Sequence, residues 1–162
     1  MRTMKIRTGL GYDVHQLKDG ADFWLGGIKV DHTKGSVGHS DADVLIHVIC
    51  DALLGAANMR DIGYHFSDTD AQYKGIDSKI LLKEVVKLIT EAGWTIGNID
   101  STICLQKPKI NPVIPNMKKC LAEVMDIPEE DISIKATTTE KLGFVGKEAG
   151  VSALASVLIQ KI

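Results

Sequence analysis

The chain has 162 residues, with 19 lysine and arginine side chains against 21 aspartate and glutamate side chains, which gives a formal charge of −2 at pH 7. This length predicts a single domain, residues 1–162, that can bury a full hydrophobic core without disulfides or a structural metal. The balanced charge, with no block of like charges, speaks against a nucleic-acid-binding or membrane-binding surface. The N-terminus also lacks the apolar run of a secretion signal, so we expect a soluble, cytoplasmic protein.

The first half of the chain predicts a strand, a hairpin and a helix. Residues 5–15 alternate in polarity, which favours a strand, and residues 22–30 favour a small hairpin that turns at two central glycines. Residues 41–57 are long and rich in alanine and leucine. They follow Ser40, with Asp43 three positions further on, which predicts a helix capped by Ser40.

The second half predicts two more helices and three strands. Residues 58–77 are polar and predict a loop, and a helix should then begin at Ser78 and end at Gly93. Residues 95–106 predict a strand. The remaining elements are a helix that opens at Asn111 and Pro112, and strands at residues 132–138 and 151–160.

About four long strands and three helices without an internal repeat predict an α+β fold, with a mixed sheet and helices on one face. The last strand carries apolar residues on both of its sides. Val151, Ala153, Ala155, Val157 and Ile159 alternate with a second set that includes Leu154 and Leu158. We therefore expect other subunits to cover the second face of the sheet.

The three cysteines indicate neither a disulfide framework nor a cysteine-based zinc site. Cys50, Cys104 and Cys120 are odd in number, far apart and without the C-x-x-C spacing. They predict reduced thiols in the core.

Five acidic and histidine residues carry spacings that suit a metal site. Asp13 and His15 lie two apart in a strand and so face the same side, while Asp43, His47 and Asp51 lie four apart along one helix face. One carboxylate and two imidazoles, from Asp13, His15 and His47, would leave one position of a tetrahedral zinc ion open, as catalytic zinc requires. Asp43 and Asp51 would support these ligands. The alternative is that His47 is a core histidine bonded to a nearby carboxylate.

Two further segments suit anions. His39 and Ser40 stand at the positive end of a helix, although Ser40 could simply cap it. Thr137, Thr138 and Glu140 follow a strand and suit a phosphate-contacting loop with Glu140 on a divalent cation; the alternative is a capping box.

A third, proline-stiffened segment carries two lysines. Lys107 and Lys109 suit phosphate as point charges, although lysines beside a helix start are usually ordinary surface residues.

Taken in order, the segments RTGLGYDVH, KGSVGHSDADVLIH, DIGYHFSDTD, QKPKI and IKATTTEKLGF closely resemble the 2-C-methyl-D-erythritol 2,4-cyclodiphosphate synthase family over nearly the whole chain. The resemblance implies a homotrimer with active sites between subunits, in the methylerythritol phosphate route to isoprenoids. It implies conversion of 4-diphosphocytidyl-2-C-methyl-D-erythritol 2-phosphate, a small nucleotide substrate, with release of CMP.

The resemblance also assigns roles. Asp13, His15 and His47 match zinc ligands, and Glu140 matches the ligand of a magnesium or manganese ion on the diphosphate. His39, Thr138 and Lys109 match catalytic positions. The positions that match substrate contacts are Asp13, Val14, His15, His39, Ser40, Asp61, Ile62, Gly63, Phe66, Ser67, Asp68, Thr69, Asp70, Leu105, Gln106, Lys107, Pro108, Lys109, Ile110, Asn111, Thr137, Thr138, Thr139, Glu140, Phe144 and Lys147.

One position departs from the family pattern. Family members often carry an arginine near the trimer axis, beside a phenylalanine that borders a channel for isoprenoid diphosphates. Here the phenylalanine is Phe144 and the arginine is replaced by Lys147, which keeps the charge without the bidentate fork.

Two other functions stay open on the sequence. A zinc-dependent phosphohydrolase would use the open metal position to activate water and would release linear phosphates. A non-enzymatic trimer would bind isoprenoid diphosphates at Phe144 and Lys147 without turnover.

Overall fold

The computed structural model describes residues 4–67 and 69–161, and its frame is a five-stranded sheet in the order β4-β1-β7-β5-β6. β5 pairs with β6 in parallel, and the other neighbours pair antiparallel, so the predicted mixed sheet is correct. Its strands are β1 (Lys5–Asp19), β4 (Lys34–Val37), β5 (Thr95–Cys104), β6 (Ile132–Thr137) and β7 (Gly150–Lys161).

Two features of the sheet differ from the prediction. β4 was missed because it has only four residues, two of them glycine and serine. β1 runs four residues further than predicted because its end, from Gln16 to Asp19, pairs with β4. The predicted hairpin is present as a separate two-stranded sheet of β2 (Trp24–Leu25) and β3 (Ile28–Lys29).

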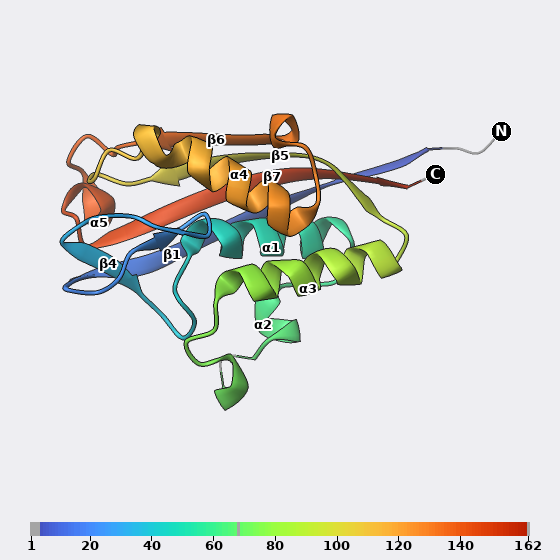
Figure 1. Ribbon diagram of the computed structural model, residues 1–162, viewed down its shortest axis with the longest axis horizontal. Coiled ribbons are helices and arrows are strands. Elements are labelled where there is room, and N and C mark those ends of the chain that lie inside the picture. The colour runs from blue at the N-terminus through green and yellow to red at the C-terminus, as the bar shows by residue number, and fades with distance from the viewer. Residues whose placement is uncertain (1–3, 68, 162) are drawn as a thin grey trace.

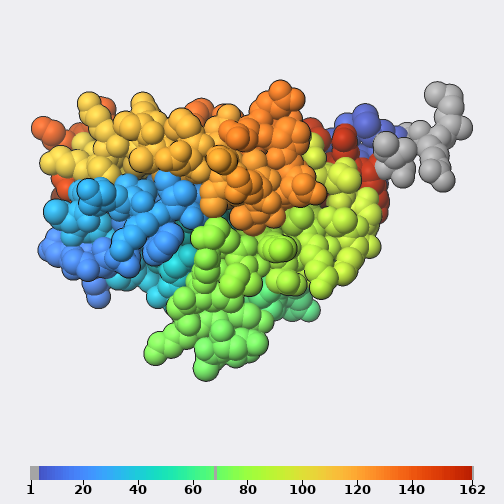
Figure 2. Space-filling view, in the orientation of Figure 1, coloured from blue at the N-terminus to red at the C-terminus, as the bar shows by residue number. Residues whose placement is uncertain are grey.

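The three predicted long helices lie on one face of the sheet (Figure 1). They are α1 (Val44–Ala56), α3 (Ser78–Glu91) and α4 (Ile114–Met125), the last entered through the 3₁₀ turn η2 (Asn111–Val113). The shorter segments are α2 (Ile62–His65), η1 (Ala71–Tyr73), η3 (Glu129–Asp131) and α5 (Gly143–Gly146). Residues 58–77, predicted as a loop, therefore contain α2 and η1, and Figure 2 shows the green segment around η1 projecting from the body of the molecule.

The predicted cap of α1 was wrong. Asp43, not Ser40, caps α1, because the left-handed backbone of Ala42 (φ 58°) turns the chain and delays the helix. The Asp43 side chain accepts a hydrogen bond from the Ile46 amide. α3 begins at Ser78, as predicted, and its cap is Asp77, which leaves the Ser78 hydroxyl free for other partners.

Helix α1 lies in van der Waals contact with the backbone of β1, because two glycines of that strand face it. A Cβ atom on Gly9 would lie 2.0 Å from the carbonyl oxygen of Ala52, and one on Gly11 would lie 2.0 Å from that of Val48. Gly9 and Gly11 share a face with Asp13 and His15, since alternate residues of a strand point the same way. The close approach therefore brings α1 next to the polar residues of β1.

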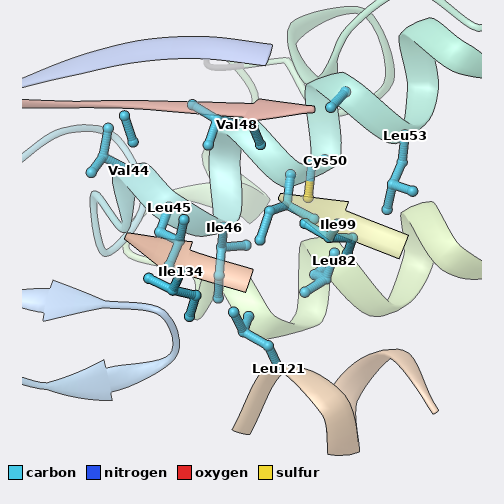
Figure 3. Packing of buried hydrophobic residues seen from close by; sticks show 14 of the residues in the cluster. Val44, Leu45, Ile46, Val48, Cys50, Leu53, Leu82, Ile99, Leu121 and Ile134 are labelled. Carbon is cyan, nitrogen blue, oxygen red and sulfur yellow. The ribbon is translucent and has the colours of Figure 1, made fainter. Parts of the chain in front are cut away.

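The core surrounds α1. Figure 3 shows Leu45 and Ile46 of α1 among side chains from α3, α4 and the sheet, including Leu82, Leu121 and Ile99. One cluster of buried residues extends from Leu17 to Ile159 and includes all three long helices. Because the core is continuous, we propose that residues 1–162 form a single domain.

The outer face of the sheet is apolar and exposed. The β7 residues from Val151 to Ile159 that face the helices are buried, as the alternation predicted. On the opposite face Leu10 is 71% exposed and Tyr12 57% exposed, and Ile6, Val14 and Leu154 are also exposed.

Cys50 is buried and free, as predicted, whereas the free thiols Cys104 and Cys120 are only half-buried. Within residues 4–67 and 69–161, no helix combines the length and the apolar character that a bilayer crossing requires.

We expect Gly11→Ala to destabilise the protein, because the new methyl group would collide with the Val48 carbonyl and force α1 away from β1. Overpacking of this kind costs about 1–3 kcal/mol, which urea unfolding of the metal-free protein would measure. Gly55→Ala in α1 is the matched control. No atom lies within 4 Å of a Cβ at Gly55, so alanine should stabilise the helix by roughly 0.5–1 kcal/mol. A Gly11→Ala protein as stable as the wild type would contradict the close approach.

Candidate metal centre and active site

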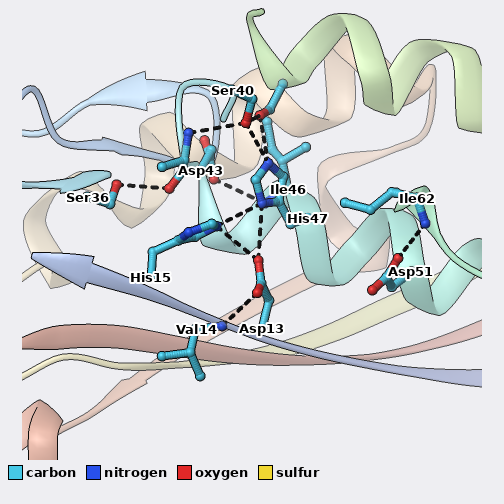
Figure 4. A network of polar contacts seen from close by, with 12 residues as sticks. Asp13, Val14, His15, Ser36, Ser40, Asp43, Ile46, His47, Asp51 and Ile62 are labelled. Atoms are coloured by element: carbon cyan, nitrogen blue, oxygen red, sulfur yellow. Dashed lines mark hydrogen bonds and ion pairs between the residues drawn. The ribbon is translucent and has the colours of Figure 1, made fainter. Parts of the chain in front are cut away.

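Three donor atoms from β1 and α1 converge at one point (Figure 4). His15 Nε2 lies 3.0 Å from Asp13 Oδ2, His47 Nδ1 lies 3.1 Å from the same oxygen, and the two nitrogens are 2.9 Å apart. The strand spacing orients Asp13 and His15 together, and the packing of α1 on β1 supplies His47. The described residues therefore contain the predicted three-residue cluster as a candidate site for a divalent metal.

The cluster fits a metal ion by its donor chemistry. Donors at the bond lengths of tetrahedral zinc are roughly 3.3 Å apart, close to the separations found here. Two imidazole nitrogens and one carboxylate oxygen suit zinc and related divalent ions. His15 and His47 also line a cavity of about 330 Å³, which would leave a further coordination position open to a ligand.

The Asp13 carboxyl is held in its charged form. Burial acts to raise the pKa of Asp13, but the neighbouring imidazoles of His15 and His47 outweigh this effect and hold that pKa well below its usual range. An ionised carboxylate is the form that binds metals.

The opposite nitrogen of His47 is also bound. His47 Nε2 lies 3.0 Å from Ser78 Oγ and 3.1 Å from Ser40 Oγ. The Ser78 hydroxyl donates to Asp41 Oδ1, and the Ser78 amide donates to Asp41 Oδ2 at 2.9 Å. Ser40, Ser78 and Asp41 thus lie on the side of the His47 ring that faces away from the candidate metal site.

The two carboxylates predicted to support the ligands have other partners. Asp43 is fully buried and accepts hydrogen bonds from the amides of Gly26 and Gly27, at 2.9 and 2.7 Å, besides that of Ile46. Burial raises the pKa of Asp43, against the lowering effect of these three amides. Asp51 accepts from the Ile62 amide at 2.8 Å. Helical spacing puts Asp43 and Asp51 on the side of His47, but their side chains bind loop backbone instead of the metal ligands.

The first cavity gathers predicted residues from four segments. Besides His15 and His47, its lining includes His39, Ser40, Ile62, Gly63 and Phe66, together with Tyr73, Ile76 and Leu81, which the sequence analysis did not name.

The neighbouring acidic and hydroxyl residues stabilise the local turns. Asp61 caps α2 and Asp70 caps η1, while the Ser67 and Thr69 hydroxyls lie 2.7 Å apart. The predicted contact Asp68 lies outside the described residues.

A second cavity of about 230 Å³ is lined largely by other residues predicted to contact substrate. Its lining consists of Leu105, Gln106, Pro108, Lys109, Ile110, Asn111, Ala136, Thr137 and Thr138. Lys107 is not part of this lining, and its amine pairs with Glu148 at 3.3 Å.

The loop after β6 has a strained backbone. Glu140 and Lys141 both have left-handed backbones (φ 53° and 65°). The Thr138 hydroxyl donates to Glu140 Oε1 at 3.0 Å, and Gln106 Oε1 accepts from the Lys141 amide at 3.2 Å. Thr139 donates to the Leu142 carbonyl, so its hydroxyl stabilises the turn itself. Phe144 lies in α5 and is 44% exposed, and Lys147 follows that helix directly.

Among the residues that the structure describes, the two cavities have no lining residue in common. His39 lies at the cavity beside the metal cluster, whereas Thr138 and Lys109 line the second cavity. The described part of this single chain therefore divides the predicted catalytic residues between two places.

Comparison with known proteins shows which family this chain is related to. A model of the YgbB family matches residues 6–160, almost the whole chain. The chain belongs to the YgbB family. The family resemblance inferred from the motifs is confirmed.

Close relatives of this YgbB chain carry one name. A protein of Parabacteroides distasonis, named 2-C-methyl-D-erythritol 2,4-cyclodiphosphate synthase, is 67% identical over 159 residues, which are 98% of this chain and 99% of the relative. A protein of Bacteroides thetaiotaomicron with the same name is 65% identical over 158 residues, again 98% and 99% of the two chains.

Solved structures agree with this YgbB fold. The bifunctional IspDF of Campylobacter jejuni matches with a TM-score of 0.95 and 39% identity over 99% of this chain, which spans 43% of that longer protein. IspF of Plasmodium falciparum in a CDP complex matches with a TM-score of 0.84 and 35% identity, over 95% of each chain.

We expect His47→Ala to lose bound metal while the protein stays folded, because two protein ligands remain of three and the core is built without the ion. Metal content after dialysis and circular dichroism would measure both effects. His32→Ala, outside the cluster, is the control and should keep the metal of the wild type. Full metal content in His47→Ala would remove His47 from the site.

Proposed function

We propose that this YgbB chain converts 4-diphosphocytidyl-2-C-methyl-D-erythritol 2-phosphate into 2-C-methyl-D-erythritol 2,4-cyclodiphosphate with release of CMP. The enzyme is a phosphorus–oxygen lyase of the methylerythritol phosphate route to isoprenoids. The observation that carries the proposal is the identity of 67% to a relative of that name, covered over 99% of its length. The metal cluster beside a cavity supports it.

The reaction needs no protein nucleophile. An oxygen of the 2-phosphate forms a bond to the β-phosphorus, and the bond from that phosphorus to the CMP oxygen breaks, so the leaving CMP takes the electron pair. The obstacle is the approach of one anion to another. The chain must therefore supply position and positive field, as in other phosphoryl transfers.

Asp13, His15 and His47 would hold a zinc ion, and Glu140 would hold a magnesium or manganese ion on the diphosphate. When bound, such ions polarise phosphoryl oxygens and offset their negative charge. The ionised Asp13 suits this role, and the exposed Glu140 carboxylate can be reached from solvent.

The other roles fall to hydrogen-bond donors. We assign His39 and Thr138 to the charge that develops on the phosphoryl oxygens, where a well-placed donor contributes about 2–4 kcal/mol. Ser40 would bind phosphate beside His39. Lys109, in the second cavity, would assist the departure of CMP. The remaining substrate contacts from Val14 to Lys147 stay predictions from sequence, and so does the cytoplasmic location.

The division of the site supports assembly. One substrate carries both a methylerythritol phosphate and a cytidine, yet the predicted substrate contacts fall into two cavities that share no lining residue within the described part of one chain. The exposed apolar face around Leu10 and Tyr12 also needs a cover in water. We infer a homotrimer with the active site between neighbouring subunits, its number taken from the family resemblance.

A zinc-dependent phosphohydrolase is the second candidate, since an open position on the cluster could also activate water. A non-enzymatic trimer that binds isoprenoid diphosphates is the third, because Phe144 is exposed near Lys147.

Phosphorus NMR separates these functions. With purified protein, substrate, zinc and magnesium, we expect the paired signals of a cyclic diphosphate to appear together with CMP. Linear phosphates would support the hydrolase. An unchanged spectrum from folded, zinc-loaded protein would contradict the proposal and favour the binding trimer.

Glu140→Gln should weaken the dependence of the rate on added magnesium, because an amide is a poorer ligand for a hard cation than a carboxylate. We expect the magnesium concentration for half-maximal rate to rise several-fold while zinc content stays constant. Glu129→Gln, in η3 and away from both cavities, is the control. An unchanged magnesium response in Glu140→Gln would remove that carboxylate from the cation site.

A further inference from the structure

A series of hydrogen bonds through three side chains leads from the candidate metal cluster into the protein. Ser78 is fully buried, and its hydroxyl lies between Asp41 and His47. Asp41 belongs to the turn before α1, Ser78 is the first residue of α3, and His47 lies in α1. These hydrogen bonds thus join three segments behind the candidate metal centre.

The donor and the acceptor of each hydrogen bond in this series can be assigned. Both oxygens of Asp41 act as acceptors: Oδ2 accepts from the Ser78 amide at 2.9 Å, and Oδ1 accepts from the Asp43 amide at 3.2 Å and from the Ser78 hydroxyl. A serine hydroxyl has one hydrogen, which here points at Asp41. Ser78 therefore turns a lone pair toward His47 Nε2, 3.0 Å away, and that nitrogen must carry the hydrogen.

The second hydroxyl near His47 does not alter this assignment. Ser40 Oγ lies 3.1 Å from His47 Nε2 and accepts from the Ala42 amide. If Ser40 donated to a bare Nε2, that lone pair would face the Ser78 lone pair at 3.0 Å, which is repulsive. With hydrogen on Nε2, both serines act as acceptors.

The cluster on the other side of the ring offers His47 Nδ1 both a hydrogen-bond donor and a competing acceptor. A hydrogen on His15 Nε2 can be shared between Asp13 Oδ2 at 3.0 Å and His47 Nδ1 at 2.9 Å. Asp13 Oδ2 also lies 3.1 Å from His47 Nδ1 and would accept a hydrogen from it when no cation is bound. The Ser78–Asp41 pair must therefore outweigh this carboxylate to keep the hydrogen on Nε2.

We propose that Asp41 and Ser78 are positioning residues that fix His47 in the tautomer with hydrogen on Nε2 and so present the Nδ1 lone pair to the metal. This inference rests on the proposed use of a metal at Asp13, His15 and His47. Histidine ligands commonly donate their second N–H to a carboxylate or carbonyl. Here a serine lies between the imidazole and the carboxylate. Asp41 orients the Ser78 hydroxyl, and the oriented hydroxyl accepts the hydrogen of His47 Nε2. Neither Asp41 nor Ser78 is a ligand or touches the first cavity's substrate space.

Zinc affinity tests the proposal. Competition with a chromophoric chelator, using the full chain and zinc alone, should show 10- to 100-fold weaker binding for Ser78→Ala and for Asp41→Asn, the range typical of such outer partners. The two Ser78 hydrogens go to different oxygens of Asp41, and asparagine replaces one of these oxygens with an NH2 group, which donates and cannot accept. The double variant should bind zinc as tightly as the single variant with the lower zinc affinity, because both residues act through one hydrogen bond to His47.

Asp77→Asn is the matched control. Asp77 caps α3 next to Ser78 and pairs with Lys79, but it makes no contact with His47. This variant should keep the zinc affinity of the wild type even if α3 is weakened. Unchanged affinity in both Ser78→Ala and Asp41→Asn, or an equal loss in Asp77→Asn, would overturn the proposal.

A second measurement needs no variant. Long-range proton–nitrogen NMR of the metal-free wild-type protein should show His47 with hydrogen on Nε2, and a Nδ1–H population should appear in Ser78→Ala. Hydrogen on Nδ1 in the wild type would overturn the proposal. Neither readout depends on CMP release. A protein that shows this tautomer but forms no cyclic product would contradict the proposed reaction and leave the positioning role unaffected.

Discussion

The contact of α1 with the backbone of β1 is the constraint on which the site depends. Gly9 and Gly11 allow the helix to approach so closely that a single methyl group on either would meet a carbonyl oxygen at 2.0 Å. At this separation His47 reaches Asp13 and His15. Because α1 is also the centre of the core, the geometry of the cluster is tied to the packing of the whole domain.

Three carboxylates around the start and length of α1 hold the surrounding segments to it. Asp43 binds the turn of the β2–β3 hairpin, Asp51 binds the first amide of α2, and Asp41 binds the first residue of α3. The cavity beside the candidate metal cluster is lined by residues of two of these segments, α2 and α3, and of the turn before α1. The segments around the site are thereby fixed to the element that carries His47, so the groups proposed to bind phosphate would need little reorganisation during the reaction.

Much of this could be predicted from sequence, for physical reasons that differ among residues. The two-residue period of a strand predicts that Asp13 and His15 face together, and the order of the motifs predicts the family. Ser78 could not be found in this way, because a serine at a helix start has a local explanation as a cap and its real partners, Asp41 and His47, are 37 and 31 residues away. Asp43 was misjudged for the related reason that helical spacing defines a face but not where a short side chain bends.

Anomalous scattering at the zinc absorption edge, from crystals of the zinc-loaded full chain, tests the central claim most directly. The account predicts one strong peak at bonding distance from Asp13 Oδ2, His15 Nε2 and His47 Nδ1, on the side open to the cavity. A peak elsewhere, or no peak at this cluster in protein that carries one zinc per chain, would contradict it.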